Sequence, residues 1–213
     1  MGRRARSQTG PSQIHTLWLV SDRAAAGPPG GYLETLRIHE DCALYYLTFS
    51  VIQWLPVFVS EESCLIITES LNFCHREKGL RINAFVIMPT HLHLIVTDAD
   101  YNVERLRQTI TDLRKYTGKQ LARYAVEKGP AVFRQAIQGT LREDRANHFW
   151  RQSRHAEGLY TYPFWKTKFN YLHDNPRRKG LVREATAWRF SSAAKWLLEP
   201  AGESDVELTG VEW

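Results

Sequence analysis

The sequence predicts an α+β domain with a ferredoxin-like or RRM-like antiparallel sheet and helices packed on one face. Short segments rich in aromatic and β-branched residues alternate with longer amphipathic segments, in the order strand, helix, strand, strand, helix. The second and third strand segments are separated only by Met88-Pro89-Thr90, which indicates a tight turn between neighbouring strands. A fold of this kind does not define a function by itself.

The first strand is expected at residues 44–52, which read LYYLTFSVI. Ser60 can cap a helix over residues 61–78, and Gly79 can end it, because each residue type suits that end of a helix. The buried stripe of this helix is expected to contain Leu65, Ile66, Leu71 and Phe73.

Two strands and a long basic helix are expected next. The strands cover residues 80–88 and 91–97, and the helix covers about residues 103–127 before Gly129-Pro130. The apolar side chains of this helix recur at helical spacing and are Leu106, Ile110, Leu113, Leu121 and Tyr124.

The last predicted elements are two helices. Thr161 can cap a helix that ends at about Asp174, because Asn175-Pro176 disfavours its continuation. A short helix is expected within residues 186–198, and residues 131–160 receive no assignment. We expect a flexible N-terminal tail at residues 1–40, one domain at 41–198 and a frayed acidic C-terminal tail at 199–213.

Charge is unevenly distributed along the chain. The formal net charge is +5, but residues 101–195 contain 20 Lys and Arg against 8 Asp and Glu. A segment this basic, with Tyr, Phe and Trp among its cations, suits a polyanion that offers flat bases. A solvated helical face would have the same composition, so charge alone leaves both readings open.

Composition indicates a cytoplasmic protein. Three cysteines, Cys42, Cys64 and Cys74, are an odd number without C-x-x-C spacing, which argues against a disulfide framework or a zinc knuckle. No apolar run approaches the ~18 residues of a membrane span, and residues 14–20 are too short and interrupted for a signal peptide. We therefore expect no membrane association.

Two histidines stand one residue apart in the run FVIMPTHLHLIV, residues 85–96. On a strand, His91 and His93 share a face with Cα atoms roughly 6.5–7 Å apart, so two imidazoles can converge on one metal ion. Leu92 and Leu94 then point toward a core. A pair of half-buried structural histidines is the alternative, and imidazoles alone suggest zinc, manganese or another transition ion.

The helix after Thr161 carries four residues that can complete such a site. Phe164, Lys168, Tyr171 and Asn175 share one face if the helix extends to Asn175. A phenol and a carboxamide one turn apart would then point together at whatever the histidines bind.

These motifs resemble a known family. VIMPTHLHLIV, followed about eighty residues later by NYLHDNPRRKGLV and then by WRFSSA, resembles the HUH-type single-tyrosine transposases, and more closely their REP-associated tyrosine transposase branch. The similarity covers most of residues 44–196, including TFSVIQWLPVF and RKYTGK. The histidine pair alone is moderately specific, whereas its combination with Tyr-x-x-x-Asn-Pro and Gly-Leu-Val is highly specific.

The resemblance implies an enzyme that binds single-stranded or hairpin DNA of the REP type and cleaves and rejoins one strand. It implies that Tyr171 is the nucleophile and that a magnesium or manganese ion is bound by His91 and His93. Asn175 occupies the position of a further polar ligand, with Asp174 as the competing candidate. DNA binding would make the cytoplasmic protein nucleoid-associated.

The residue types suit this chemistry. Attack of a phenolate on phosphorus gives a 5′-phosphotyrosine and a free 3′-hydroxyl, and a later hydroxyl can reverse the step. A phenol ionises near pH 10 in water, so the reaction needs help from a metal at the phosphate. Lys168, one turn before Tyr171, can favour the phenolate or instead face DNA or solvent.

Three further groups of residues have predicted positions or contacts. The predicted DNA contacts are Arg114, Lys115 and Lys119 on the basic helix and Arg177, Arg178 and Lys179 after the tyrosine. Three tryptophans can stack bases or lie in the core, and they are Trp150, Trp165 and Trp188. The remaining histidines without a chelating partner are expected at the surface: His75, His148, His155 and His173.

Two other functions stay open at this point. A metal-dependent nuclease that uses water as nucleophile would form no covalent protein–DNA adduct. A domesticated DNA-binding protein would bind without cutting. Monomer and homodimer are both compatible with the sequence.

Overall fold

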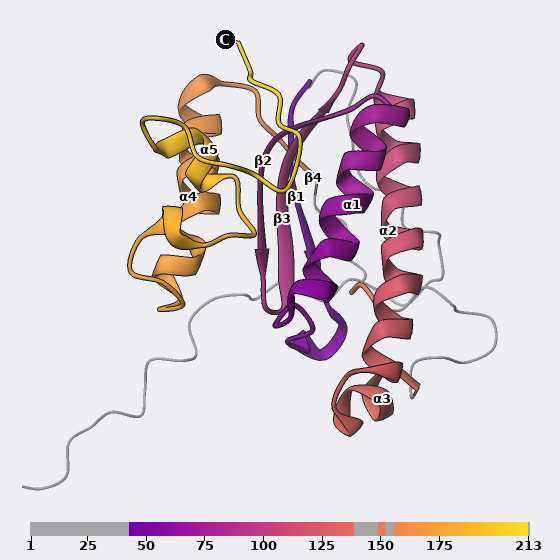
Figure 1. The fold of residues 1–213 in the computed structure, drawn as a ribbon. Helices are drawn as coiled ribbons and strands as arrows, with labels where there is room; N and C mark the ends of the chain where they lie inside the picture. The colour runs from indigo at the N-terminus through magenta and orange to yellow at the C-terminus, as the bar shows by residue number, and fades with distance from the viewer. Residues whose placement is uncertain (1–42, 139–148, 152–155, 213) are drawn as a thin grey trace, which may run out of the picture. The chain divides into compact units, whose positions relative to one another are not determined.

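The protein folds as a four-stranded antiparallel sheet with helices on both faces (Figure 1). The computed structural model describes residues 43–138, 149–151 and 156–212. The strands are β1 (Tyr45–Ser50), β2 (Leu80–Met88), β3 (His91–Asp98) and β4 (Ala156–Gly158), in the spatial order β2-β3-β1-β4. β3 lies between β1 and β2, as in the split β-α-β unit of ferredoxin-like domains. The predicted α+β antiparallel class is confirmed.

The predicted helices are present with small changes at their ends. The helices are α1 (Glu61–Glu77), α2 (Val103–Glu127), α3 (Ala131–Gln138), α4 (Tyr162–Arg178) and α5 (Ala193–Leu197), with short 3-10 turns η1 (Ile52–Trp54) and η2 (Ala185–Ala187). Both predicted N-caps form, because Ser60 accepts from the Ser63 amide at 3.3 Å and Thr161 from the Phe164 amide at 3.4 Å. The predicted tail at residues 1–40 lies outside the described residues.

The sheet has an apolar side chain pattern on both faces. Leu92 and Leu94 pack with residues of α1 and α2, whereas Val86 and Ile95 pack with Leu172 of α4. Figure 1 shows α1 and α2 on one face of the sheet and α4 on the other. The expectation of helices on one face therefore does not hold for α4. Strands that are apolar on both faces must be covered twice, and α4 provides the second cover. The histidines face α4, because they alternate with Leu92 and Leu94.

The buried stripe of α1 differs from the prediction, whereas that of α2 agrees. The buried stripe of α1 has helical spacing and consists of Cys64, Ile67, Leu71 and Cys74. Phe73, which we expected inside, is 51% exposed. The prediction failed because the two cysteines were not counted as small apolar residues. In α2 the predicted core residues Leu106, Ile110, Leu113 and Leu121 are buried, and Tyr124 is partly buried.

Helix α4 continues one turn beyond its predicted end at Asp174. Pro176 lies inside the helix, and the stop comes at Gly180, whose φ of 71° is left-handed. Two backbone bonds close the end: Gly180 N donates to the Arg177 carbonyl and Leu181 N to the Pro176 carbonyl, both at 2.9 Å. This is the Schellman arrangement of a glycine-terminated helix. Asn175 and Arg178 therefore belong to the same helix as Tyr171.

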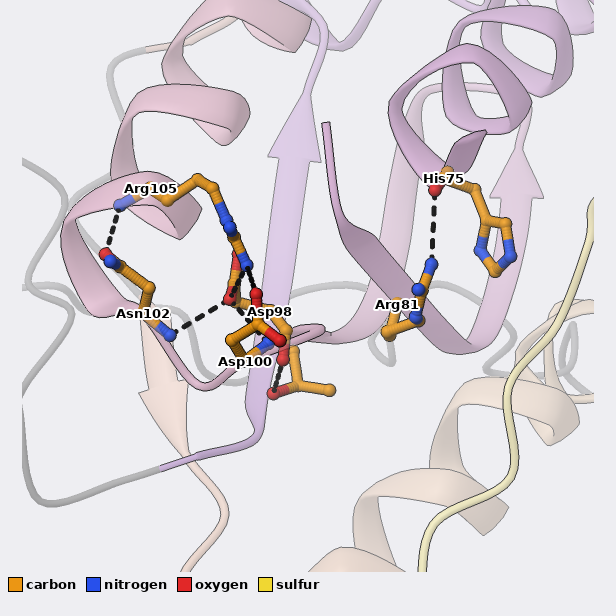
Figure 2. A network of polar contacts seen from close by, with 7 residues as sticks. His75, Arg81, Asp98, Asp100, Asn102 and Arg105 are labelled. Carbon is orange, nitrogen blue, oxygen red and sulfur yellow. Dashed lines mark hydrogen bonds and ion pairs between the residues drawn. The ribbon is translucent and has the colours of Figure 1, made fainter. Parts of the chain in front are cut away.

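The junction between β3 and α2 is fastened by a buried carboxylate (Figure 2). Asp98 is 2% exposed and accepts two hydrogen bonds from the Arg105 guanidinium, each at 2.6 Å. It also accepts from the amides of Asp100 and Asn102, and Asn102 in turn caps α2. Burial raises the pKa of Asp98, but these hydrogen bonds outweigh it and hold the pKa below its usual value. Figure 2 also shows Arg81 donating to the carbonyl of His75.

We expect Asp98→Asn to lower the free energy of unfolding by about 2 kcal/mol, because a buried acceptor of four hydrogen bonds becomes partly a donor. Asp100→Asn is the matched control, since Asp100 also contacts Arg105 but is mostly exposed. The control should change stability by less than about 0.5 kcal/mol. Urea unfolding of both variants measures the difference, and equal effects would contradict this account of the junction.

The segment after Pro200 is ordered against the domain, contrary to the expectation of a frayed end. Val206 is buried, and Asn72 of α1 donates to the Asp205 carbonyl at 2.9 Å. Thr209 N donates to the Ile82 carbonyl on the outer edge of β2 at 2.8 Å. The acidic side chains have basic partners, since Arg76 pairs with Glu207 and Arg189 with Asp205. Among the described helices, none is long and apolar enough to cross a membrane.

Candidate active site

The two histidines are held at the start of β3 by threonine hydroxyls. His93 lies directly across from Thr48 of β1, and its Nδ1 is 2.8 Å from the Thr48 hydroxyl. The Nδ1 of His91 is 2.9 Å from the hydroxyl of Thr90. The ring centres of His91 and His93 are 4.7 Å apart. With each Nδ1 engaged, each Nε2 is the nitrogen left to bind a ligand, which is the usual arrangement of metal-binding histidines.

Both imidazoles are neutral at pH 7. Burial, followed by the charge of Lys179, lowers the pKa of His91 to about 4. Burial, followed by His91 and Lys168, lowers the pKa of His93 to about 3. A metal ligand must be unprotonated, so both histidines are ready to coordinate without first losing a proton.

Helix α4 places Tyr171 beside the histidine pair. The ring centres of Tyr171 and His93 are 6.1 Å apart, and Tyr171 is 42% exposed. The guanidinium carbon of Arg178 lies 4.7 Å from the centre of the Tyr171 ring. Seven residues correspond to two helical turns, so Arg178 reaches Tyr171 only because α4 continues past Pro176. The prediction assigned Arg178 to DNA and missed this contact, because it ended the helix too early.

Asn175 and Asp174 have different surroundings. Asn175 is buried, and its Nδ2 donates to the Tyr171 carbonyl at 3.1 Å, which leaves the amide oxygen for another partner. Asp174 is engaged by Arg177 at 2.5 and 3.0 Å. It lines a shallow surface hollow of about 340 Å³ together with Tyr171 and Arg178. Among the described residues, the Asn175 amide oxygen accepts no side-chain hydrogen bond, whereas both carboxylate oxygens of Asp174 accept from Arg177.

The residues present fit a divalent metal held by few protein ligands. Over the described part of the chain, no group of three or more His, Cys, Asp or Glu side chains could hold an ion. An ion held by the two neutral histidines would keep positions for water and other oxygen ligands, which magnesium and manganese accept. The buried hydroxyl of Tyr46 has no hydrogen-bond partner within the described chain. The ring centres of Tyr46 and His93 are 5.2 Å apart. Burial raises the pKa of Tyr46 far above its usual value, so this hydroxyl remains a donor for a water or phosphate oxygen.

Lys168 lies at the site but is not a free surface lysine. It pairs with Glu157 of β4 at 2.6 Å, and its ammonium is 5.2 Å from the centre of the Tyr46 ring. The Lys168 side chain is 24% exposed, and the alternatives in which it faces DNA or solvent stay predictions. Its proposed support of the Tyr171 phenolate remains a prediction.

Two of the predicted DNA contacts lie beside the site. Arg178 covers the Tyr171 ring, and the charge of Lys179 acts on His91. Arg177 is instead paired with Asp174. The end of α4 thus places positive charge beside Tyr171 and His91.

The other three predicted contacts stand on α2, which covers the opposite face of the sheet (Figure 1). Lys115 and Lys119 are exposed there. Arg114 reaches toward the end of β1, where it donates to the Arg151 carbonyl at 2.9 Å and lies over Phe49. The structure therefore separates the two groups of basic residues that the sequence suggested.

Some expected surface or base-stacking residues are structural. Trp150 is buried in the core, where its Nε1 donates to Thr117. Trp165 and Trp188 are partly buried. The indole of Trp165 donates to the Asn83 side chain, and that of Trp188 donates to the Ile87 carbonyl. His148 and His155 lie outside the described residues, and His75 is partly buried.

His173 is buried, contrary to the expectation of a surface histidine. Its Nε2 is 2.7 Å from the hydroxyl of Ser192, which also accepts from the Phe85 amide at 2.9 Å. This contact gives the WRFSSA motif a structural role, because it ties α4 to β2 and thus supports the position of Tyr171.

We expect acid to destabilise the protein through His173. Burial lowers its pKa to about 4, against about 6.5 for an unfolded imidazole. Between these values the unfolded chain binds more protons, so the free energy of unfolding falls as pH falls. From pH 7 to 4.5 this group contributes a loss of about 2–3 kcal/mol, and His91 and His93 act in the same direction. Urea unfolding at both pH values should show a smaller loss for His173→Gln, and an unchanged loss would contradict the assignment.

Comparisons with known proteins are sparse. The sequence matches no known protein-family model, and a search of curated proteins finds no match. Among solved structures, a REP-associated tyrosine transposase bound to a REP hairpin is similar, with 15% sequence identity and a TM-score of 0.49. The alignment covers 89% of this chain and 95% of that chain. Similarity this distant does not establish a family for this chain.

Proposed function

We propose that this protein is a metal-dependent tyrosine transposase, which acts as a single-stranded DNA endonuclease and strand transferase. The observation that carries the proposal is the meeting of a histidine pair from β3 with Tyr171 from α4, at 6.1 Å between ring centres. These residues are about eighty positions apart in the sequence, and the fold brings them together on one face of the sheet. The HUH and Tyr-x-x-x-Asn-Pro motifs support the same function.

The proposed reaction is a transesterification at phosphorus. The Tyr171 oxygen forms a bond to the scissile phosphorus and releases its proton to water, while the bond from phosphorus to the 3′-oxygen breaks. The 3′-oxygen takes up a proton and leaves as a hydroxyl, and the 5′-phosphate stays on Tyr171. Reversal by another 3′-hydroxyl rejoins strands without an external energy source.

Each side chain of the site has a distinct task in this reaction. His91, His93 and Asn175 would hold magnesium or manganese, which supplies polarisation of a phosphate oxygen when bound. The Arg178 guanidinium, 4.7 Å from the Tyr171 ring centre, stabilises negative charge on the phenolate and orients the ring. Thr48 and Thr90 fix the imidazole orientations.

Label transfer on a denaturing gel tests the proposal. A hairpin DNA strand labelled at its 3′ end is incubated with the protein and manganese, and the label is expected to migrate with the protein. Excess chelator should prevent the transfer. Cleavage without transfer would instead indicate a nuclease that uses water, and binding without cleavage would indicate a DNA-binding protein.

The two groups of basic residues predict different salt dependences. A short single strand at the site reaches Arg178 and Lys179, so replacing both with Gln should reduce the slope of log affinity against log salt by about 1.4. The matched control, Lys115→Gln with Lys119→Gln on α2, should leave this slope unchanged for a short strand. It should reduce the slope only for a longer hairpin whose phosphates reach Lys115 and Lys119 on α2. An unchanged slope for the α4 variant would place the DNA elsewhere.

A further inference from the structure

An exposed tryptophan that the site chemistry does not use lies next to His91. Trp54 belongs to the turn η1 directly after β1, and it is 48% exposed. Its ring centre is 6.3 Å from that of His91, with the two rings nearly perpendicular. An exposed aromatic ring next to positive charge can serve as a stacking platform for a flat ligand.

The backbone holds Trp54 outward rather than letting it pack in the core. Gln53 and Trp54 have φ values of 51° and 56°, a left-handed conformation that costs energy for residues other than glycine. The turn is anchored on both sides of this strained pair, because Ile52 N donates to the Phe149 carbonyl and Leu55 N to the Ile52 carbonyl. The flanking side chains of Ile52 and Leu55 are buried, whereas Gln53 and the indole of Trp54 are exposed.

One face of the indole already accepts a flat cationic group. The guanidinium carbon of Arg151 lies 4.7 Å from the Trp54 ring centre. Arg151 is itself placed by its backbone, which donates to the Ser50 carbonyl at 2.7 Å and accepts from Arg114 at 2.9 Å. Ser50 lies across from His91 in the sheet, so this pair is built into the same end of β1 and β3 as the histidines.

We propose that Trp54 and Arg151 form a stacking site for one unpaired base of the DNA strand. This inference rests on the proposed function, because it places the scissile phosphate at His91 and His93. Successive bases are about 3.4 Å apart along a stacked strand, so a base on Trp54 lies within about two nucleotides of that phosphate. Aromatic rings and arginine planes both stack on bases with little dependence on sequence.

The chemistry around Trp54 favours a nucleotide as the occupant. Arg151 with Arg114 beside Trp54, and Lys179 near His91, supply positive charge for the flanking phosphates. A base inserted at the indole takes the place of the Arg151 guanidinium, which is on a flexible stem and can move onto the base or its phosphate. The site then sets which phosphate of an unpaired arm reaches Tyr171.

A comparison of two DNA probes tests this proposal by fluorescence anisotropy without metal, using the Tyr171→Phe protein so that no strand is cut. One probe is a labelled hairpin with oligothymidine arms, and the other has abasic arms with the same phosphates. The Tyr171→Phe protein should prefer the thymidine arms by roughly tenfold. Trp54→Ala in this background should lose the preference while keeping its affinity for the abasic arms.

Two further variants and one control make the result decisive. Trp54→Gly also removes the ring but suits a positive φ, so it should behave as Trp54→Ala does without a folding penalty. Trp54→Phe should keep most of the preference. Phe73→Ala, which removes an equally exposed ring on α1, should keep all of it. A preference that survives Trp54→Gly, or that is absent before mutation, would overturn the stacking site. Failure of label transfer by the wild-type protein would instead overturn the proposed reaction and leave this binding result unaffected.

Discussion

Replacing Tyr171 with phenylalanine is expected to abolish strand cleavage and covalent capture of DNA. Loss of the attacking oxygen should reduce the rate by at least about a thousandfold, because the other groups of the site cannot replace a nucleophile. The fold should be unaffected, since Tyr171 is 42% exposed and the phenyl ring can still pack beneath Arg178. Single-turnover cleavage of a labelled hairpin measures the effect, with DNA affinity measured in parallel.

Tyr116→Phe is the matched control for this prediction. Tyr116 is also an exposed tyrosine on a helix, but it stands on α2, which covers the opposite face of the sheet. Its replacement should leave cleavage at the wild-type rate. Equal loss of activity in both variants, or an adduct that persists in Tyr171→Phe, would remove Tyr171 from its assigned role.

Replacement of either histidine with alanine is expected to reduce metal-dependent cleavage by more than about a hundredfold. Each variant should also bind manganese more weakly by calorimetry, and this readout does not depend on activity. Thr48→Val tests the same site with a smaller expected effect. It removes the hydroxyl that holds Nδ1 of His93 and keeps the side chain volume. It should weaken metal binding by roughly tenfold. Full cleavage by His91→Ala or His93→Ala in excess chelator would contradict the metal role.

The sheet and the histidine pair were predictable because their signals are local. Alternation with a period of two identifies β3 from HLHLIV alone, and it places His91 and His93 on one face whatever surrounds them. The caps Ser60 and Thr161 were predictable for the same reason, since a cap depends on residues three positions away.

At the end of α4, one local stop signal in the sequence is overridden by another. Asn175-Pro176 predicts a stop, but Gly180 supplies the left-handed residue that closes the helix after Arg178. Proline removes one backbone hydrogen bond, but Pro176 and Asn175 are both buried within the continuing helix. The consequence is functional, because the added turn brings Arg178 to the Tyr171 ring.

Other features depend on tertiary contacts that no sequence pattern encodes. The burial of His173 follows from Ser192, nineteen residues later, and from the cover that α4 provides on the second face of the sheet. The pairing of Lys168 with Glu157 depends on β4, which spans only Ala156–Gly158. The stacking of Arg151 on Trp54 joins segments nearly one hundred residues apart.

The most direct test of the proposed function is the identity of the residue that carries DNA. Wild-type protein is allowed to react with a hairpin strand and manganese, the DNA is trimmed by nuclease, and tryptic peptides are analysed by mass spectrometry. We predict a nucleotide attached through a 5′-phosphate to Tyr171, and no modified peptide in excess chelator. A nucleotide on another residue such as Tyr116 or Tyr124, or cleaved DNA with no modified peptide, would contradict the assignment of Tyr171 as the nucleophile.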